Sequence, residues 1–172
     1  MENSKLTPNS LAFIALSNEF CSAVENALEL EKEDFVAKML KLLPRIYMSV
    51  TDIDIEESSE EYYALPYLDE CYYDNIRSQI ARLMGEDDVF LETFEEDMKY
   101  SDAPVSATIS EDIADIYQQL YNFVASVRDV DAEAINSIII TCKEDFASFW
   151  GQTLCNVLRA LHSVFYNSQE QH

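Results

Sequence analysis

Glycine and proline are scarce in this chain, which has 2 glycines and 4 prolines among 172 residues. An all-β chain of this size needs many tight turns, and glycine best supplies the positive φ angles of such turns. The scarcity therefore argues against an all-β fold. It favours long helices that are joined by few turns.

Basic residues are also few, with 11 Lys and Arg against 33 Asp and Glu, a formal net charge of −22. A surface this negative repels phosphate backbones and anionic lipid headgroups, so we expect no nucleic acid and no membrane as partner. A basic protein partner and a purely solubilising role both remain compatible with this charge, because net charge speaks to solubility rather than fold.

Long hydrophobic runs and paired cysteines are missing as well. The N-terminal apolar run LAFIAL is followed directly by Ser17. The run is too short for the apolar part of a secretory signal, which has about 7–15 residues. No run approaches the roughly 18 residues of a membrane span. The cysteines form no C-x-x-C pair and lie in apolar, helix-like contexts, typical of reduced, buried thiols: Cys21, Cys71, Cys142 and Cys155. The sequence therefore predicts a cytoplasmic protein.

Motifs for catalysis and metal binding are lacking too. The chain has neither the H-E-x-x-H nor the Glu-x-x-His pattern, and the acidic stretch 52–56 lacks the glycine of a calcium loop. Cys155 and His162 share a helix face but lie about 10 Å apart along its axis, too far for direct proton transfer. We therefore expect no catalytic residue, no metal and no cofactor.

What the sequence does contain is apolar residues at helical spacing, in about five long segments of one all-α bundle. The first segment runs from about 9 to 30, with Ser10 or Asn9 as its N-cap. The second runs from about 33 to 51. Pro44 lies inside it and predicts a kink or a break, because proline removes one helical hydrogen bond.

Two acidic segments, 52–74 and 86–97, contain no Lys or Arg. Because like charges repel, we expect a solvated loop up to about residue 65 and a short helix or turn in 86–97. Pro66 is then expected to start a third helix, with Gly85 as its left-handed C-cap. Residues 98–108 are expected to form a loop.

The last two helices are predicted from caps and length. The pattern Thr108-x-x-Glu111 indicates a capping box at the start of a helix that ends near Arg128. The final helix, at about 131–166, is predicted to be the longest. One domain is expected over 9–167, with flexible tails at 1–8 and 168–172.

Special residues gather in the stretch FASFWGQTLCNVLRALH, residues 146–162. A helical wheel places Trp150 on the buried face of the final helix. Ala147, Gly151 and Cys155 form a stripe of small residues beside it, which predicts a close crossing by a neighbouring helix.

Five tyrosines gather in EEYYALPYLDECYYD, at positions 62, 63, 67, 72 and 73. Exposed aromatic residues with polar tips are common interface anchors. The alternative, which the sequence favours, is that these rings pack under the acidic loop with their hydroxyl groups in water.

The sequence therefore supports two function hypotheses. The first is a non-catalytic protein interaction module, whose acidic face meets a basic partner or whose apolar groove meets a helix. The second is a small-ligand protein or enzyme with a polar site at Asp112, Asp115, Arg159 and His162. An ion pair between Arg159 and Asp115 across the bundle would be a structural alternative to that site. Mimicry of nucleic acid by the acidic surface is the least favoured hypothesis. It needs regularly spaced carboxylates, whereas the two acidic segments are expected to be loop-like.

Several segments, taken in order, resemble a bacterial all-helical domain family of unknown function. They are ARLMGEDD (81–88), EDIADIYQQL (111–120), FWGQT (149–153) and LRALH (158–162). In that family, histidines often flank the Trp-Gly pair, whereas this chain has Phe149 and Thr153 there. The resemblance spans most of residues 10–166. It implies an all-helical fold and no established activity.

Overall fold

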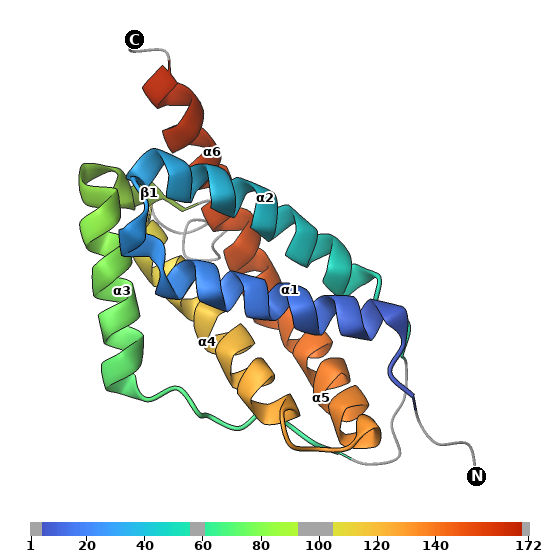
Figure 1. The fold of residues 1–172 in the computed structure, drawn as a ribbon. Helices are drawn as coiled ribbons and strands as arrows, with labels where there is room; N and C mark the ends of the chain where they lie inside the picture. Colours follow the sequence, from blue (N-terminus) through green and yellow to red (C-terminus); the bar gives the residue numbers. More distant parts are fainter. Residues whose placement is uncertain (1–4, 56–60, 93–104, 170–172) are drawn as a thin grey trace.

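Six α-helices and a two-stranded ribbon make up most of residues 5–55, 61–92 and 105–169, the parts of the chain that the computed structural model describes (Figure 1). The all-α bundle expected from the sequence is confirmed. Of the two expected tails, residues 1–4 and 170–172 lie outside the described parts.

Helix α1 (Pro8–Glu25) begins earlier than predicted. Its N-cap is Thr7, whose hydroxyl oxygen accepts a hydrogen bond from the Ser10 backbone N–H at 3.1 Å. The prediction of Ser10 or Asn9 as N-cap was wrong because Pro8 occupies the first turn, where its fixed φ favours helix initiation. The short 3₁₀ helix η1 (Ala27–Glu29) follows α1 and replaces the last turn of the predicted helix.

Helix α2 (Lys32–Thr51) runs through Pro44 without the break that proline could cause. Its buried face repeats at helical spacing and packs against α1 and α6. This face consists of Phe35, Val36, Met39, Leu42, Leu43, Ile46 and Val50.

Helix α3 (Glu70–Met84) starts four residues after Pro66, so the prediction that Pro66 begins this helix was wrong. Asp69 is the N-cap, and its carboxylate accepts a hydrogen bond from the Tyr72 backbone N–H at 2.7 Å. Gly85 is the C-cap as predicted and has the positive φ that favours glycine, 59°, but its ψ of −128° lies outside the left-handed helical region.

A small antiparallel ribbon interrupts the helices. The 3₁₀ helix η2 (Gly85–Asp88) leads into strand β1 (Val89–Leu91), which pairs with β2 (Ser106–Thr108). The predicted helix or turn in 86–97 is thus correct for η2 and wrong for β1, and residues 93–97 lie outside the described parts. The predicted loop at 98–108 likewise ends in a strand. Three residues are too few for an alternating pattern to be recognised.

Helix α4 (Ile109–Val127) is capped by Thr108, whose hydroxyl accepts from the Glu111 backbone N–H, as the capping box predicts. The last part of the chain is helical from Ala132 to Gln169. It consists of α5 (Ala132–Asp145), a π-helical segment η4 (Phe146–Trp150) and α6 (Gly151–Gln169). The long final helix is confirmed, and it includes residues 168–169 of the predicted tail.

Helix α4 is the centre of the bundle, because it contacts α1, α3, α5 and α6 (Figure 1). Phe13 of α1 and Phe123 of α4 are fully buried, and their ring centroids lie 4.9 Å apart. Trp150 is fully buried as the helical wheel predicts. Within the described parts, no helix is both long enough and apolar enough to cross a membrane.

Gly151 is constrained by its own helix. A Cβ atom on Gly151 would lie 2.5 Å from the Phe146 carbonyl oxygen and 3.1 Å from the Phe146 ring, because the π-helical segment brings both close. Ala147 and Cys155 are exposed. The predicted crossing of a neighbouring helix over this small-residue stripe was therefore wrong.

Candidate functional site

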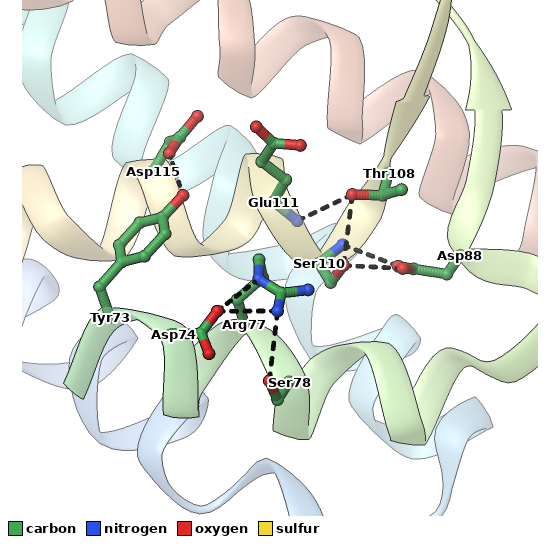
Figure 2. Close-up of polar contacts among 9 residues, drawn as sticks. All are labelled: Tyr73, Asp74, Arg77, Ser78, Asp88, Thr108, Ser110, Glu111 and Asp115. Carbon is green, nitrogen blue, oxygen red and sulfur yellow. Dashed lines mark hydrogen bonds and ion pairs between the residues drawn. The ribbon is translucent and has the colours of Figure 1, made fainter. Parts of the chain in front are cut away.

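Asp115, one of the four predicted site residues, faces α3 from α4. The Tyr73 hydroxyl group donates a hydrogen bond to the Asp115 carboxylate, with 2.5 Å between the two oxygen atoms (Figure 2). Burial raises the pKa of Asp115, and the hydrogen bond from Tyr73 opposes that rise. Burial and the hydrogen bond to Asp115 raise the pKa of Tyr73. The pair links α3 to α4, so Asp115 has a structural partner.

The two site residues on α6 have other partners. Arg159 donates a guanidinium N–H to the Leu91 carbonyl oxygen on β1. The His162 ring centroid lies 4.5 Å from that of Tyr166 on the same helix. Arg159 therefore does not form the structural ion pair with Asp115 that was considered from the sequence.

Asp112, the fourth predicted residue, is buried on the first turns of α4, with 8% of its surface exposed. Asp115, Arg159 and His162 contact three different elements, α3, β1 and α6. The structure thus gives no contact that joins these three side chains in one site.

A second polar cluster holds the start of α4. The buried Asp88 carboxylate accepts from the Ser110 backbone N–H through one oxygen and from the Ser110 hydroxyl through the other, each at 2.7 Å (Figure 2). Asp88 thereby satisfies a helix N-terminal donor from outside the helix. The arrangement is a tertiary cap, and it has a structural role.

The extended segment 61–69 leads into α3 and passes over α4 and α5; we call it the tyrosine strap (Figure 1). Three of its backbone N–H groups donate to side chains of these helices. Tyr62 N–H donates to Ser137 Oγ at 2.8 Å. Leu65 N–H donates to Ser126 Oγ, and Leu68 N–H donates to Asn122 Oδ1, both at 2.9 Å. The strap is fixed without being part of a helix or sheet.

The side chains of the strap point largely outward. Tyr63 is 62% exposed and Tyr67 is 54% exposed, whereas Leu68 is buried. The expectation that these rings pack under the acidic loop was therefore wrong for Tyr63 and Tyr67. Side chains of α4 and α5 satisfy three backbone N–H groups of the strap, and Tyr63 and Tyr67 expose more than half of their surface.

Carboxylates surround the strap. Asp129 and Asp131 lie on the turn between α4 and α5, which the strap passes (Figure 1). Arg77 forms an ion pair with Asp74 at 2.8 Å. The exposed acids on the strap, at the start of α3 and on this turn are Glu61, Asp69, Glu70, Asp74, Asp129 and Asp131. Arg128 on the same turn is also exposed, so this end of the bundle combines exposed aromatic rings with more carboxylates than basic side chains.

Three of the four cysteine thiols have a raised pKa, which is the opposite of what a nucleophilic thiol needs. Burial raises the pKa of Cys21 and Cys142, and the buried part of the otherwise exposed Cys155 raises its pKa too, which keeps these thiols protonated near neutral pH. An activated cysteine has a lowered pKa. Cys71 and Cys155 are exposed, so the expectation that all four thiols are buried was wrong for these two.

The raised pKa of Cys142 predicts a pH effect on stability. A group whose pKa is higher in the folded state stabilises the fold fully below its unfolded pKa, about 8.5 for cysteine, and loses that contribution as pH rises. Each such group adds a slope of about −1.4 kcal/mol per pH unit to the free energy of unfolding above about pH 9. Urea unfolding across this range should show a slope shallower by about that amount in Cys142→Ala. Cys71→Ala, which removes an exposed thiol, is the control; equal slopes for wild type and Cys142→Ala would contradict the prediction.

The chain is similar to a protein family and to a solved structure. The profile of DUF5063, a domain of unknown function, matches residues 4–167. The crystal structure of protein BF1032 from Bacteroides fragilis, a structural genomics target, is 30% identical in sequence. The alignment covers 91% of this chain and 92% of that chain, with a TM-score of 0.78. No curated protein matches the chain. These likenesses support the fold and give no activity.

Proposed function

The chain belongs to the DUF5063 family, and we propose that it is a non-catalytic protein interaction module. Its binding surface is the tyrosine strap with the carboxylates around it, and its partner is a basic, extended protein segment. The observation that carries the proposal is the strap itself, which is held by three helix side chains and presents its tyrosines to solvent.

The chemistry of the surface fits such a partner. Tyrosine rings attract Arg and Lys side chains through their faces, and nearby carboxylates add charge pairing. Because Ser126, Ser137 and Asn122 already fix the strap, little conformational entropy is lost when a partner binds. The same negative charge disfavours nucleic acid and anionic membrane as partners.

A role without catalysis agrees with the thiols described above, whose raised pKa opposes nucleophilic use. We propose the cytoplasm as the compartment, since reduced thiols persist there. The four cysteines are free, which is compatible with that compartment.

The proposal is tested by placing a photo-crosslinking amino acid at Tyr63 and, as the control, at Tyr166. Tyr166 is similarly exposed but lies at the far end of α6. A captured partner is then purified and its affinity measured for wild type and for Tyr63→Ser/Tyr67→Ser. This double variant keeps the net charge and should bind about tenfold more weakly, a loss typical of an interface anchor.

Three results would overturn the proposal. Crosslinking from Tyr166 as strong as that from Tyr63 would place the contact elsewhere. If the tyrosine variant binds with unchanged affinity, the two tyrosines do not contribute to binding, and general charge attraction alone would explain it. Binding that does not weaken as salt concentration rises would contradict a basic partner, because salt screens exposed charges within about 8–10 Å.

A further inference from the structure

The start of α2, η2 with β1, and the second half of α6 meet at the end of the bundle opposite the tyrosine strap (Figure 1). Residues of these elements line a pocket. Its volume is about 360 Å³, within the range of about 300–1,000 Å³ typical of small-ligand sites. Ile109 and Ala160 are buried beneath it. The apolar lining consists of Val89, Phe90, Ile109, Ala160 and Val164.

Hydrogen-bonding side chains from α6 form one wall. Arg159, Ser163 and Asn167 are spaced by four residues, so they lie on one helix face, and all three line the pocket. Arg159 donates to the Leu91 carbonyl oxygen, which holds the guanidinium at the pocket. A guanidinium has five N–H donors, so others stay available to a ligand. Among the described residues, Arg159 forms no ion pair.

In the described parts of the chain, the charged side chains that line the pocket are two cations and two anions, namely Lys32, Arg159, Glu86 and Asp87. Lys32 forms an ion pair with Asp87 at 2.7 Å, and the hydrogen bond to Asp87 raises the pKa of Lys32. Glu86 also lines the pocket. Arg159 and Glu86 are the cation and the anion of the lining that this ion pair does not include, although the charge of Glu86 also raises the pKa of Lys32. A phosphate dianion would be repelled by the two carboxylates, whereas a ligand carrying one charge of each sign would match the lining.

We propose that this pocket binds a free α-amino acid with an apolar side chain, as the zwitterion. Its carboxylate pairs with Arg159, because a planar guanidinium matches a carboxylate in bidentate geometry. Its ammonium group pairs with Glu86, since Asp87 is already paired with Lys32. Its side chain covers Phe90 and Val164. This small-ligand site is separate from the protein interaction proposed above and does not depend on it.

The test uses L-leucine and L-phenylalanine as probes of the full chain. Each is titrated up to its solubility limit while two-dimensional NMR follows the backbone amides. We expect saturable shifts at residues 86–91 and 159–167. N-acetyl-leucine lacks the ammonium group and leucinamide lacks the carboxylate, so each should bind about tenfold more weakly, the effect of losing one charge-assisted contact.

Matched variants separate the two ends of the ligand. Arg159→Gln should weaken leucine binding about tenfold but should leave leucinamide binding unchanged. Glu86→Gln should weaken leucine binding and leave N-acetyl-leucine binding unchanged. Arg45→Gln is the control, because Arg45 pairs with Glu19 between α1 and α2, away from the pocket.

Two results would overturn the inference. One is the absence of saturable shifts at the pocket with both amino acids. The other is equal affinity for leucine, its acetyl derivative and its amide, which would show that the charged ends are not recognised. Either result is independent of crosslinking at the tyrosine strap, so the two proposals can fail separately.

Discussion

Gly151→Ala should destabilise the fold by about 2–3 kcal/mol. At an ordinary position inside a helix, the same substitution stabilises by about 1 kcal/mol, because alanine has the higher helix propensity. Here the new Cβ would lie 2.5 Å from the Phe146 carbonyl oxygen. That oxygen belongs to the backbone of the π-helical segment and cannot move without altering its hydrogen bonds. The sign of the effect therefore distinguishes a constrained glycine from a neutral one.

Urea unfolding followed by circular dichroism measures this effect. Cys155→Ala is the matched control, since Cys155 is exposed one turn further along α6 and its loss should change stability by less than about 0.5 kcal/mol. Gly151→Ala at or above wild-type stability would show that η4 relaxes to α-helical geometry at little cost.

The sequence predicts buried faces better than it predicts their local geometry. Trp150 was correctly placed in the core, because apolar residues recur along the final helix at the α-helical period. The close contact at Gly151 was assigned to a neighbouring helix, since the same wheel cannot reveal a π-helical segment. One extra residue in a turn changes which carbonyl oxygen meets the glycine while leaving the apolar pattern almost unaltered.

Cap prediction depended on a second residue that distinguishes one candidate from its neighbours. Thr108 has Glu111 three residues later, which neither Ser106 nor Ser110 has, and it caps α4 as expected. At the first helix Thr7, Asn9 and Ser10 all have suitable side chains, and Pro8 directly after Thr7 is the signal that points to Thr7, because proline favours the first helical position. The sequence also could not identify the tyrosine strap as fixed, because its hydrogen-bond acceptors lie more than fifty residues further along the chain.

The candidate site was predictable only in part for a similar reason. Arg159 was predicted as one of the four residues of a polar site, and it does line a pocket. Its predicted neighbour Asp115 instead binds Tyr73. Which residues of separate elements meet depends on how those elements pack, and periodicity within one helix carries no such information. Lys32 and Glu86, which line the pocket with Arg159, come from segments far away in sequence.

Asp88→Ala should cost about 2–3 kcal/mol of stability, because the substitution removes the acceptor of the buried Ser110 backbone N–H and leaves the Ser110 hydroxyl only the longer bond to Thr108 Oγ1, at 3.3 Å. The Ser110 backbone N–H lies in the first turn of α4, where no helical carbonyl oxygen is available to it. Leaving such a donor without a partner carries its full desolvation cost. Equilibrium unfolding in urea measures the total loss. Hydrogen exchange should show the first turn of α4 opening more readily than the rest of the helix.

Two further variants identify the cause of that loss. Asp88→Asn keeps one oxygen acceptor, so it should cost less than Asp88→Ala. In a double-mutant cycle, Asp88→Ala and Ser110→Ala should show a coupling of about 1 kcal/mol, because both remove the bond between carboxylate and hydroxyl. Additive effects, or a loss in Asp88→Ala below about 0.5 kcal/mol, would mean that water replaces the carboxylate and that the cap is not what holds η2 to α4.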